Sequence, residues 1–347
     1  MTLSVQTVLG AIAPEEMGFT LPHEHLFWDL GFYLDKSVDP NDPCDVRNAP
    51  LTMDQLGNLR YHMYEYRDNL VQTDVDTAAQ ELIWYRECGG GTICDNSAVG
   101  MGRFPEKIRE ASARSGVHVV LGTGAYCSYT LPAWMARMDK SEMAEFFVRE
   151  LETDIGDTGI RCGFIGEIGI NEGFPEGDRR SLAAAAIAQR QTGAAILIHQ
   201  PGLEHWADEM FRIIEENGGS LEKTIMCHCD PLMDDPAYID HMAKSGANIS
   251  YDFFGLEFVM TLKGYKNLWL PTDHQRIAAI ADQIARGNLE KLFVSHDTVY
   301  KSMLRKYGGY GYVHLIRDMI PLMLAEGYEA GWIEQITKCN PQRVFAR

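Results

Sequence analysis

The stretch 21–25, Leu-Pro-His-Glu-His, decides how this chain is interpreted. It follows a short apolar run that begins at Met17, and it places two histidines two positions apart. Residues two apart on a β-strand point to the same face of the sheet. His23 and His25 are therefore predicted to form a pair of metal ligands where the strand ends. Near-adjacent histidines also occur by chance, so the prediction depends on the residues that end the other strands.

Outward from this stretch, short apolar runs alternate with amphipathic segments. The apolar runs are predicted strands, and the amphipathic segments are predicted helices. After the first strand, the predicted strands cover 92–95, 117–124, 162–169, 195–199, 224–228, 248–252 and 291–297. The predicted helices cover 74–87, 104–115, 141–156, 178–192, 205–217, 236–245, 274–286, 313–326 and 330–338.

This alternation predicts parallel βαβ units. Eight such strands in a chain of 347 residues predict an α/β fold of one domain, 1–347, as a (β/α)₈ TIM barrel. An open doubly wound sheet is the alternative architecture, and it requires a glycine-rich phosphate turn after an early strand. The three glycines at 89–91 precede a predicted strand and are interpreted as the break that ends a helix, so the barrel is favoured.

Residues 27–75 interrupt the alternation directly after the first strand. The segment is rich in aromatic and turn residues, among them Trp28, Tyr33 and Tyr64, and we expect it to include some helix. Long connections of this kind are usually functional or disordered. The aromatic content favours an ordered insertion, either as a lid over the barrel or packed against its outside.

Composition and charge narrow the class of partner. The net charge of −18 argues against nucleic acid or an anionic membrane surface as the partner. We find no apolar stretch approaching the roughly 18 residues that a transmembrane helix needs. The N-terminus lacks the basic start and apolar core of a signal peptide. The eight cysteines include no C-x-x-C pair. We therefore expect a cytoplasmic homodimer that acts on a small-molecule substrate.

Two of the cysteines, Cys227 and Cys229, flank His228 and raise the question of zinc ligation. If His228 faces the inside of the barrel on a regular strand, both thiols face outward. We expect them to pack under the helices as buried thiols rather than to bind metal.

The ends of the predicted strands carry a recurring kind of residue. Active sites of (β/α)₈ barrels lie at the carboxyl ends of the strands, where side chains from several strands converge. Residues able to bind metal end five of the eight predicted strands, and they are His23, His25, Glu167, His199, His228 and Asp297. One of them alone has a structural explanation, but the set predicts a metal site.

The number of ligands suggests two divalent ions. One ion is assigned to His23, His25 and Asp297, the other to His199 and His228, and Glu167 bridges them. Two ions about 3.5–4 Å apart share a hydroxide, lower its pKa and polarise the electrophile. Nitrogen and oxygen ligands suit Zn²⁺, with Co²⁺, Mn²⁺, Fe²⁺ or Ni²⁺ as alternatives. Asp297 is predicted to accept the proton from the attacking hydroxide and to return it to the leaving group.

A second carboxylate stands close to these ligands. Asp230 follows His228 by two residues, and it relays that proton outward or is a surface carboxylate of the loop. The spacing alone leaves both readings open.

Several segments of the chain together resemble the phosphotriesterase family of the amidohydrolase superfamily. The resemblance runs through nearly the whole chain and is specific for the family rather than for a substrate. The matching segments are Gln6-Thr-Val-Leu-Gly, Leu-Pro-His-Glu-His at 21–25, Asp95-Asn-Ser with Gly102-Arg103, Gly122-Thr-Gly-Ala-Tyr, Gly166-Glu-Ile-Gly, Ile198-His199, Tyr251-Asp-Phe-Phe-Gly, Ser295-His-Asp297, Lys306-Tyr-Gly-Gly-Tyr-Gly-Tyr and Asn340-Pro-Gln-Arg-Val-Phe.

The resemblance has consequences for individual residues. Many members carry a carboxylated lysine at the bridge, where this chain has Glu167, as in the phosphotriesterase-related subgroup, whose animal members hydrolyse an N-acyl amino-sulfonate. Tyr126 resembles the family tyrosine that can hydrogen-bond the substrate, or it is a rim aromatic. Arg103 pairs an anionic substrate or forms a salt bridge between loops. Lys301 and Arg305 recognise a carboxylate or sulfonate, or lie in a solvated loop, which we favour.

The sequence and the resemblance together predict a binuclear metal-dependent hydrolase. Its metal-bridging hydroxide attacks the carbonyl of a lactone, ester or acyl amide. The alternatives are a phosphotriester hydrolase, which the Glu167 bridge makes less favoured, a mononuclear deaminase-like enzyme on the same fold, and a non-catalytic ligand-binding homologue.

Overall fold

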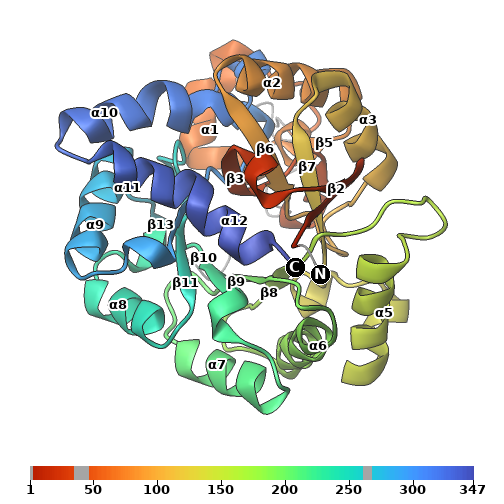
Figure 1. The fold of residues 1–347 in the computed structure, drawn as a ribbon. Coiled ribbons are helices and arrows are strands. Elements are labelled where there is room, and N and C mark those ends of the chain that lie inside the picture. The colour runs from red at the N-terminus through yellow and green to blue at the C-terminus, as the bar shows by residue number, and fades with distance from the viewer. Residues whose placement is uncertain (1–2, 35–46, 261–267) are drawn as a thin grey trace.

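In the computed structural model, which describes residues 3–34, 47–260 and 268–347, eight parallel strands form a barrel surrounded by helices (Figure 1). Neighbouring strands follow the order β3-β6-β7-β8-β9-β10-β11-β14. The barrel strands are β3 Phe19–Glu24, β6 Gly90–Asp95, β7 His118–Thr123, β8 Phe164–Gly169, β9 Ile196–His199, β10 Thr224–Cys227, β11 Asn248–Tyr251 and β14 Leu292–Val294. The predicted single-domain (β/α)₈ barrel is confirmed.

The first and last barrel strands meet through the residues that end them. The amide of Asp297 donates to the carbonyl of His23 at 3.1 Å, and the amide of His23 donates to Oγ of Ser295 at 3.1 Å. Glu24 lies fully buried at this seam and accepts hydrogen bonds from Ser295, His296 and Thr298. A buried carboxylate with several donors is well compensated, so Glu24 fastens the end of β14 to β3.

Helices cover the outside of the barrel, and the longer ones bury an apolar stripe. Helix α7 shows the pattern, since Ala207, Met210, Phe211 and Ile214 are buried at the spacing of one helix face. The helices are α1 Leu56–His62, α2 Val75–Glu87, α3 Pro105–Ser115, α4 Ala133–Ala136, α5 Lys140–Glu152, α6 Glu176–Thr192, α7 Ala207–Glu216, α8 Pro236–Lys244, α9 Asp273–Ala285, α10 Ile320–Ala325, α11 Ala330–Glu334 and α12 Asn340–Phe345. Within the described residues, no helix is both long and apolar enough to cross a bilayer.

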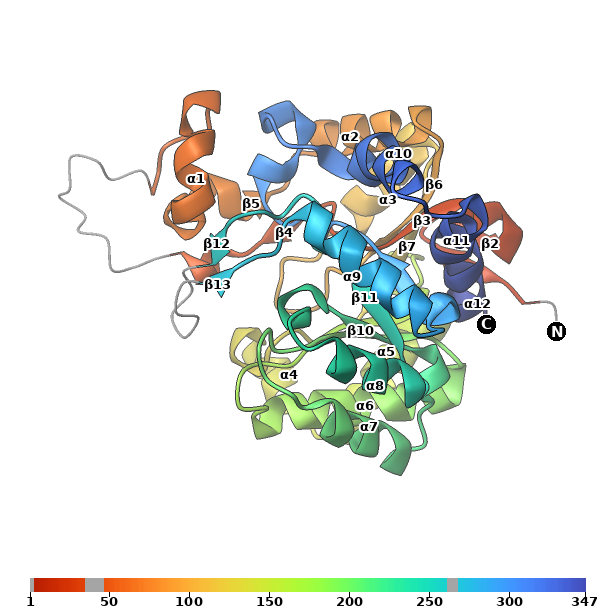
Figure 2. The same ribbon diagram turned by 90° about the vertical axis from the view of Figure 1, so that its left-hand side faces the viewer.

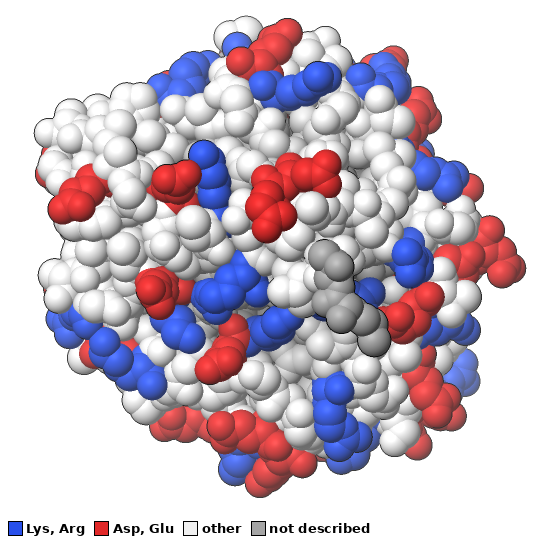
Figure 3. Space-filling view, in the orientation of Figure 1, with Lys and Arg blue, Asp and Glu red and all other residues white. Residues whose placement is uncertain are grey.

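The end of the barrel that carries the termini is closed by apolar packing. Val344 and Phe345 of α12 join Val5 of β1 and barrel residues such as Phe164 in one buried cluster. An N-terminal hairpin lies here, with β1 Val5–Thr7 antiparallel to β2 Gly10–Ile12. Figure 1 shows α12 crossing this end of the barrel, next to both termini. On the same face acidic and basic side chains lie interspersed (Figure 3).

Strand β6 differs from the sequence prediction at its beginning. Gly90 and Gly91 belong to the strand instead of forming the break that ends the preceding helix. A Cβ on Gly91 would lie 2.3 Å from the carbonyl oxygen of Met17. Glycine is therefore required here because two backbone segments approach closely, which is a different reason from helix termination.

The last helices also differ from the prediction. The segment predicted at 313–326 contains a π-helical turn, Leu315–Met319, before α10. The segment predicted to end at 338 continues through a second π-helical turn, Gln335–Cys339, into α12. In both places a proline, Pro321 or Pro341, stands in the first turn after the wide segment. Proline lacks an N–H and collides with the carbonyl four residues before it, and a wider turn relieves that collision.

The insertion at 27–75 lies at the opposite end of the barrel from the termini. Strands β4 Trp28–Asp29 and β5 Val71–Gln72 pair antiparallel and bracket helix α1. Figure 2 places α1 at this end, near the hairpin of β12 Val259–Met260 and β13 Leu268–Trp269. Residues 35–46 of the insertion lie outside the described part of the chain. The described remainder of the insertion contributes to the mouth of the barrel.

Candidate metal centre

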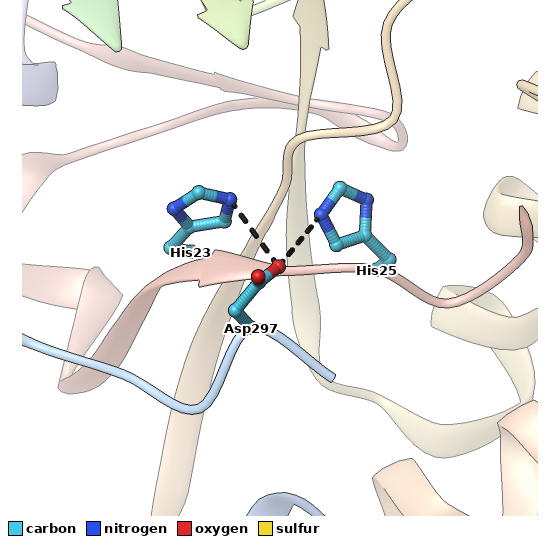
Figure 4. A group of neighbouring side chains, drawn as sticks. All are labelled: His23, His25 and Asp297. Atoms are coloured by element: carbon cyan, nitrogen blue, oxygen red, sulfur yellow. Dashed lines mark ion pairs between the residues drawn. The ribbon is translucent and has the colours of Figure 1, made fainter. Parts of the chain in front are cut away.

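All six residues predicted as metal ligands converge at the carboxyl ends of the strands. His23 and His25 extend from β3 on one face, and Glu24 between them turns to the seam described above. Figure 4 shows the Asp297 carboxylate between the two imidazoles. Its Oδ1 lies 3.5 Å from Nε2 of His23 and 3.1 Å from Nε2 of His25. We call His23, His25 and Asp297 the seam trio, because they come from the two strands that close the barrel.

Three further ligands come from consecutive strands on the other side of the barrel. Oε2 of Glu167 lies 3.2 Å from Nδ1 of His199 and 3.8 Å from Nε2 of His228. The facing nitrogens of His199 and His228 are 2.8 Å apart. We call Glu167, His199 and His228 the sheet trio. Each trio brings its ligand atoms within 4.8 Å of one another, which is close enough for one shared ion.

Glu167 reaches both trios with its two oxygens. Its Oε1 lies 3.6 Å from Nε2 of His25, and its Oε2 lies 3.4 Å from Nε2 of His23. The same Oε2 faces His199. The Glu167 carboxylate therefore lies between the histidines of the two trios, at the position predicted for the bridging ligand.

Several of these ligand atoms are buried without a hydrogen-bond partner. Nε2 of His23, Nε2 of His25 and Oε2 of Glu167 all lack one, although each is shielded from solvent. Unsatisfied buried polar atoms are rare in folded proteins because each costs about 1–3 kcal/mol. Three such atoms in one cluster fit bound cations, since lone pairs that no hydrogen bond uses are what a metal ion requires.

The imidazoles are held by partners on their far sides. Asp252 lies 3.0 Å from Nδ1 of His23 and 2.9 Å from Nδ1 of His228, so one carboxylate orients a ligand in each trio. Nδ1 of His25 lies 3.0 Å from Oγ of Ser97. Contacts of this kind fix the ring orientation and direct Nε2 to the metal.

Asp252 is a functional residue that the sequence analysis missed. It is fully buried and directly follows β11, which ends at Tyr251. Its position at the end of a strand is the same signal that found Asp297 and His199. The motif Tyr251-Asp-Phe-Phe-Gly was recognised as a whole, but no role was given to its carboxylate.

The electrostatics of the cluster favour bound positive charge. Burial opposes ionisation of Glu167, yet His23 and His199 hold its pKa well below the usual value. Burial also opposes the charged form of His228, but Asp252 and Glu167 raise its pKa to about 10. The same balance of burial against carboxylates raises the pKa of His23. The site is therefore built to stabilise cations.

Three of the ligands face the centre only because the chain departs from regular strand geometry. His228 and Asp297 have left-handed backbones, with φ of 59° and 50°. Such conformations are uncommon outside glycine and concentrate at functional sites. In β8 the pairing with β9 shifts between Ile165 and Ile168. This irregularity turns Glu167 inward while Ile168 packs toward the helices.

The irregularity at His228 overturns one expectation about the cysteines. Both thiols were predicted to face outward. Cys229 does pack in the cluster beneath the helices, but Cys227 joins Ile225 and Leu197 inside the barrel. Regular alternation fails here because His228 is left-handed, so it and its preceding neighbour Cys227 both face the interior. Neither thiol is part of a metal-binding group within the described residues.

A cavity of about 880 Å³ opens over the cluster. Glu167, His199 and Asp297 form part of its floor. Aromatic side chains form much of its wall, and they are Phe32, Tyr33, Tyr64, Tyr126, Tyr129, Phe253, Phe258 and Tyr300. The ring of Tyr126 lies 5.1 Å from that of His199. The predicted substrate contact Tyr126 is thus beside the cluster.

The structure places the other predicted contact, Arg103, away from this cavity. Its guanidinium forms a bidentate pair with Glu150 of α5 at 2.7 Å and is largely buried. Arg103 is absent from the residues that line the cavity over the cluster. The second reading of Arg103, a salt bridge, is the one that the structure shows, although its partner lies on a helix.

Three other polar side chains near the strand ends are also committed to partners. Lys301 pairs with Asp68 at 2.5 Å, and the guanidinium of Arg305 lies over the Trp84 ring. Asp230 is fully buried rather than a surface carboxylate.

The partner of Asp230 is a buried guanidinium. Oδ1 of Asp230 accepts from Nε of Arg276 at 2.6 Å. Burial raises the pKa of Asp230 to about 6 despite this pair. An arginine does not release a proton at physiological pH, so this contact does not continue a proton path outward.

Comparison with known proteins agrees with this architecture. The family model described as "Phosphotriesterase family" matches residues 3–345. N-acetyltaurine hydrolase of Danio rerio is 34% identical over 343 residues, which cover 98% of this chain and 97% of that protein. N-acetyltaurine hydrolase of Homo sapiens is 31% identical, with 98% of this chain and 97% of that protein covered.

Two solved structures are similar over nearly the whole length. A resiniferatoxin-binding protein from Rhodobacter sphaeroides is 32% identical with a TM-score of 0.94, covering 99% of this chain and 94% of that one. The phosphotriesterase homology protein of Escherichia coli, solved with phosphate in its active site, is 26% identical with a TM-score of 0.78. That alignment covers 95% of this chain and 99% of the other. The match spans the chain from its first strand to its last helix, and this hydrolase belongs to the phosphotriesterase family.

Proposed function

We propose that this chain is a binuclear metal-dependent hydrolase that cleaves the acyl bond of a small amide, with lactones and esters as related substrates. The observation that carries the proposal is the convergence of buried, unpartnered ligand atoms from His23, His25 and Glu167. His23, His25 and Asp297 would hold one ion, His199 and His228 the other, and Glu167 both. Zn²⁺ suits these ligands best, with Co²⁺, Mn²⁺, Fe²⁺ or Ni²⁺ as alternatives.

When bound, the ions would supply Lewis acidity and lower the pKa of the attacking water. The protein supplies the proton transfer. Asp297 lines the cavity floor and is the more exposed of the two carboxylate ligands. Its side chain is 12% exposed, against 2% for Glu167. It would take the proton of the attacking water and return it to the leaving nitrogen or oxygen.

An acyl amide is the leading substrate class for three reasons. Relatives that share 31–35% identity over nearly the whole chain are named N-acetyltaurine hydrolases. The proposed bridge is Glu167, as in the phosphotriesterase-related subgroup. A glutamate bridge argues against fast phosphotriester hydrolysis, so that reaction is at most a side reaction. The aromatic wall of the cavity suits an apolar acyl or alkyl group next to the scissile bond.

Metal content tests the site. The wild-type protein should bind two equivalents of divalent metal per chain by elemental analysis, and Glu167→Ala should lower this sharply. Glu172→Ala is the matched control, because Glu172 is an exposed carboxylate at the same cavity and forms part of neither trio. A wild-type protein with one tight ion and no weaker second one would support the mononuclear alternative and contradict the binuclear scheme.

A substrate panel tests the reaction. The metal-loaded protein should hydrolyse N-acetyltaurine or another N-acyl amine faster than phosphotriesters, with lactones and 4-nitrophenyl acetate between them. Saturable binding without turnover of any compound would support the non-catalytic alternative. The homodimer belongs to the same proposal and is tested by light scattering; the cytoplasmic location is tested by cell fractionation.

A further inference from the structure

Three phenols form a connected group on the wall of the cavity. The hydroxyl of Tyr33 lies 2.9 Å from that of Tyr126, and the hydroxyl of Tyr129 donates to that of Tyr33 at 3.4 Å. All three residues line the cavity over the cluster. Tyr33 comes from the insertion after the first strand, while Tyr126 and Tyr129 follow β7. The contact therefore joins two loops over the ligands.

Either Tyr33 or Tyr126 can donate the hydrogen bond between their hydroxyls. A phenol has one proton to donate and can accept as well. Tyr33 accepts from Tyr129, so its own proton can go to Tyr126. When Tyr33 donates in this way, the proton of Tyr126 can point into the cavity. Donor chains of this kind strengthen the last donor, because each bond polarises the next.

Packing holds the group in this arrangement. The ring of Tyr33 lies 4.4 Å from Phe32 and 6.0 Å from Tyr64. Tyr126 is nearly fully buried, with 3% of its surface exposed. Burial raises the pKa of Tyr33, so this phenol keeps its proton at neutral pH and can donate it. The Tyr126 hydroxyl thus has a fixed neighbour.

Tyr126 and the proposed proton acceptor, Asp297, are associated with different trios. Tyr126 stands beside His199 of the sheet trio, whereas Asp297 belongs to the seam trio. A carbonyl bound between them would meet Asp297 on the side of the attacking water and Tyr126 on the side of its oxygen. Donors aimed at the oxygen that gains charge accelerate acyl transfer.

We propose that Tyr33 is a positioning residue that orients the Tyr126 hydroxyl toward the substrate carbonyl oxygen, where it stabilises the developing negative charge. This rests on the proposed acyl hydrolase function. The insertion at 27–75 would then shape the chemistry as well as cover the cavity. Tyr129 is the outermost member and contributes less, because its bond is long and the residue is 55% exposed.

A double-mutant cycle tests the assignment. The proteins are the zinc-loaded wild type, Tyr33→Phe, Tyr126→Phe and the double variant, with Tyr61→Phe as the matched control. Tyr61 is an exposed phenol whose ring contacts Trp269 and is absent from the lining of the cavity. The first measurement is the calorimetric affinity for inorganic phosphate, a tetrahedral anion that imitates the charged intermediate. The second is kcat and KM for N-acetyltaurine and 4-nitrophenyl acetate.

Tyr126→Phe should weaken phosphate binding and lower kcat by about 10- to 100-fold, toward the range of a lost oxyanion donor. Tyr33→Phe should cost about 2- to 12-fold, the effect of one neutral hydrogen bond. The double variant should match Tyr126→Phe alone, since Tyr33 acts through Tyr126. KM, metal content and melting temperature should change little, and Tyr61→Phe should behave as wild type.

Equal losses from Tyr33→Phe with and without Tyr126 would show an independent structural role and overturn the assignment. Phosphate binding that is absent in the wild type, or equal in all variants, would also overturn the assignment. If no acyl compound is hydrolysed but the phosphate pattern holds, the proposed function fails and the role of Tyr33 stands. If hydrolysis occurs and the cycle is additive, the function stands and the role of Tyr33 fails.

Discussion

The two trios are built from different parts of the barrel. The seam trio joins the first and last strands, so its geometry exists only once the barrel has closed. The sheet trio comes from β8, β9 and the end of β10, which are neighbours in the sheet and close in sequence. The trios also differ in exposure. His25 is fully buried, whereas a quarter of the His199 side chain is exposed to the cavity.

This difference suggests a division of labour. A buried ion with a carboxylate ligand of its own exchanges slowly, while an ion next to the open cavity exchanges and meets substrate more readily. Asp252 links the two trios, because β11 lies between β10 and β14 in the sheet and its end faces both His23 and His228. The Asp252 carboxylate thus connects the seam trio, which forms when the barrel closes, to the sheet trio, which consecutive strands form.

The largest effect is expected from the carboxylate of the seam trio. Asp297→Asn keeps the size of the side chain but removes the proposed proton acceptor. We expect kcat to fall by about 10²- to 10⁴-fold, the usual contribution of positioned proton transfer. The melting temperature should stay near that of the wild type. An Asp297→Asn protein with nearly full turnover would show that another group moves the proton.

The comparison between the trios is sharpened by deleting one histidine from each. His199→Ala should lose the more exchangeable ion and keep one equivalent after dialysis against a weak chelator. His25→Ala should disturb the ion that the wild type holds longest. Each loss should exceed the roughly 10- to 100-fold affinity cost of removing an outer hydrogen bond. Metal content during timed chelation checks this, and identical release from both variants would contradict the division.

Asp252→Asn should weaken both trios at once, since it changes the partner of His23 and of His228. We expect metal affinity to fall by about 10- to 100-fold at both ions, as for other residues that orient metal-binding histidines. Ser97→Ala is the matched comparison, because Ser97 contacts only His25 among the histidines of the cluster. Competition titration with a chelating dye measures both, and a loss confined to one ion in Asp252→Asn would refute its linking role.

The smallest effect is expected from dissolved CO₂. Glu167 carries its carboxylate covalently, so apo-protein should regain metal and activity equally in CO₂-depleted and bicarbonate-rich buffer. Glu167→Lys introduces a longer cationic side chain that repels both ions. That variant should be nearly inactive without bicarbonate and partly rescued by it. Dependence of the wild-type protein on bicarbonate would place the bridge on a lysine elsewhere.

Much of the site follows from the sequence because the barrel imposes a simple rule. Apolar runs of strand length end in His25 and His199, and strands of a (β/α)₈ barrel all end at one mouth. Regular alternation accounts for His199, since Ala195 and Leu197 precede it on the inner face of β9. Local pattern and fold class therefore suffice where the strand is regular.

Only the tertiary structure decided the remaining contacts. Glu167 and His228 face the centre through a register shift and a left-handed residue, which depend on neighbouring strands and which alternation does not predict. The partners of Arg103 and Asp230, namely Glu150 and Arg276, lie 46 or 47 positions away along the chain. The pairing of His23 with Asp252 spans 229 positions. Such contacts arise from the packing of the barrel and its helices, because the sequence specifies which groups exist while tertiary packing determines which of them meet.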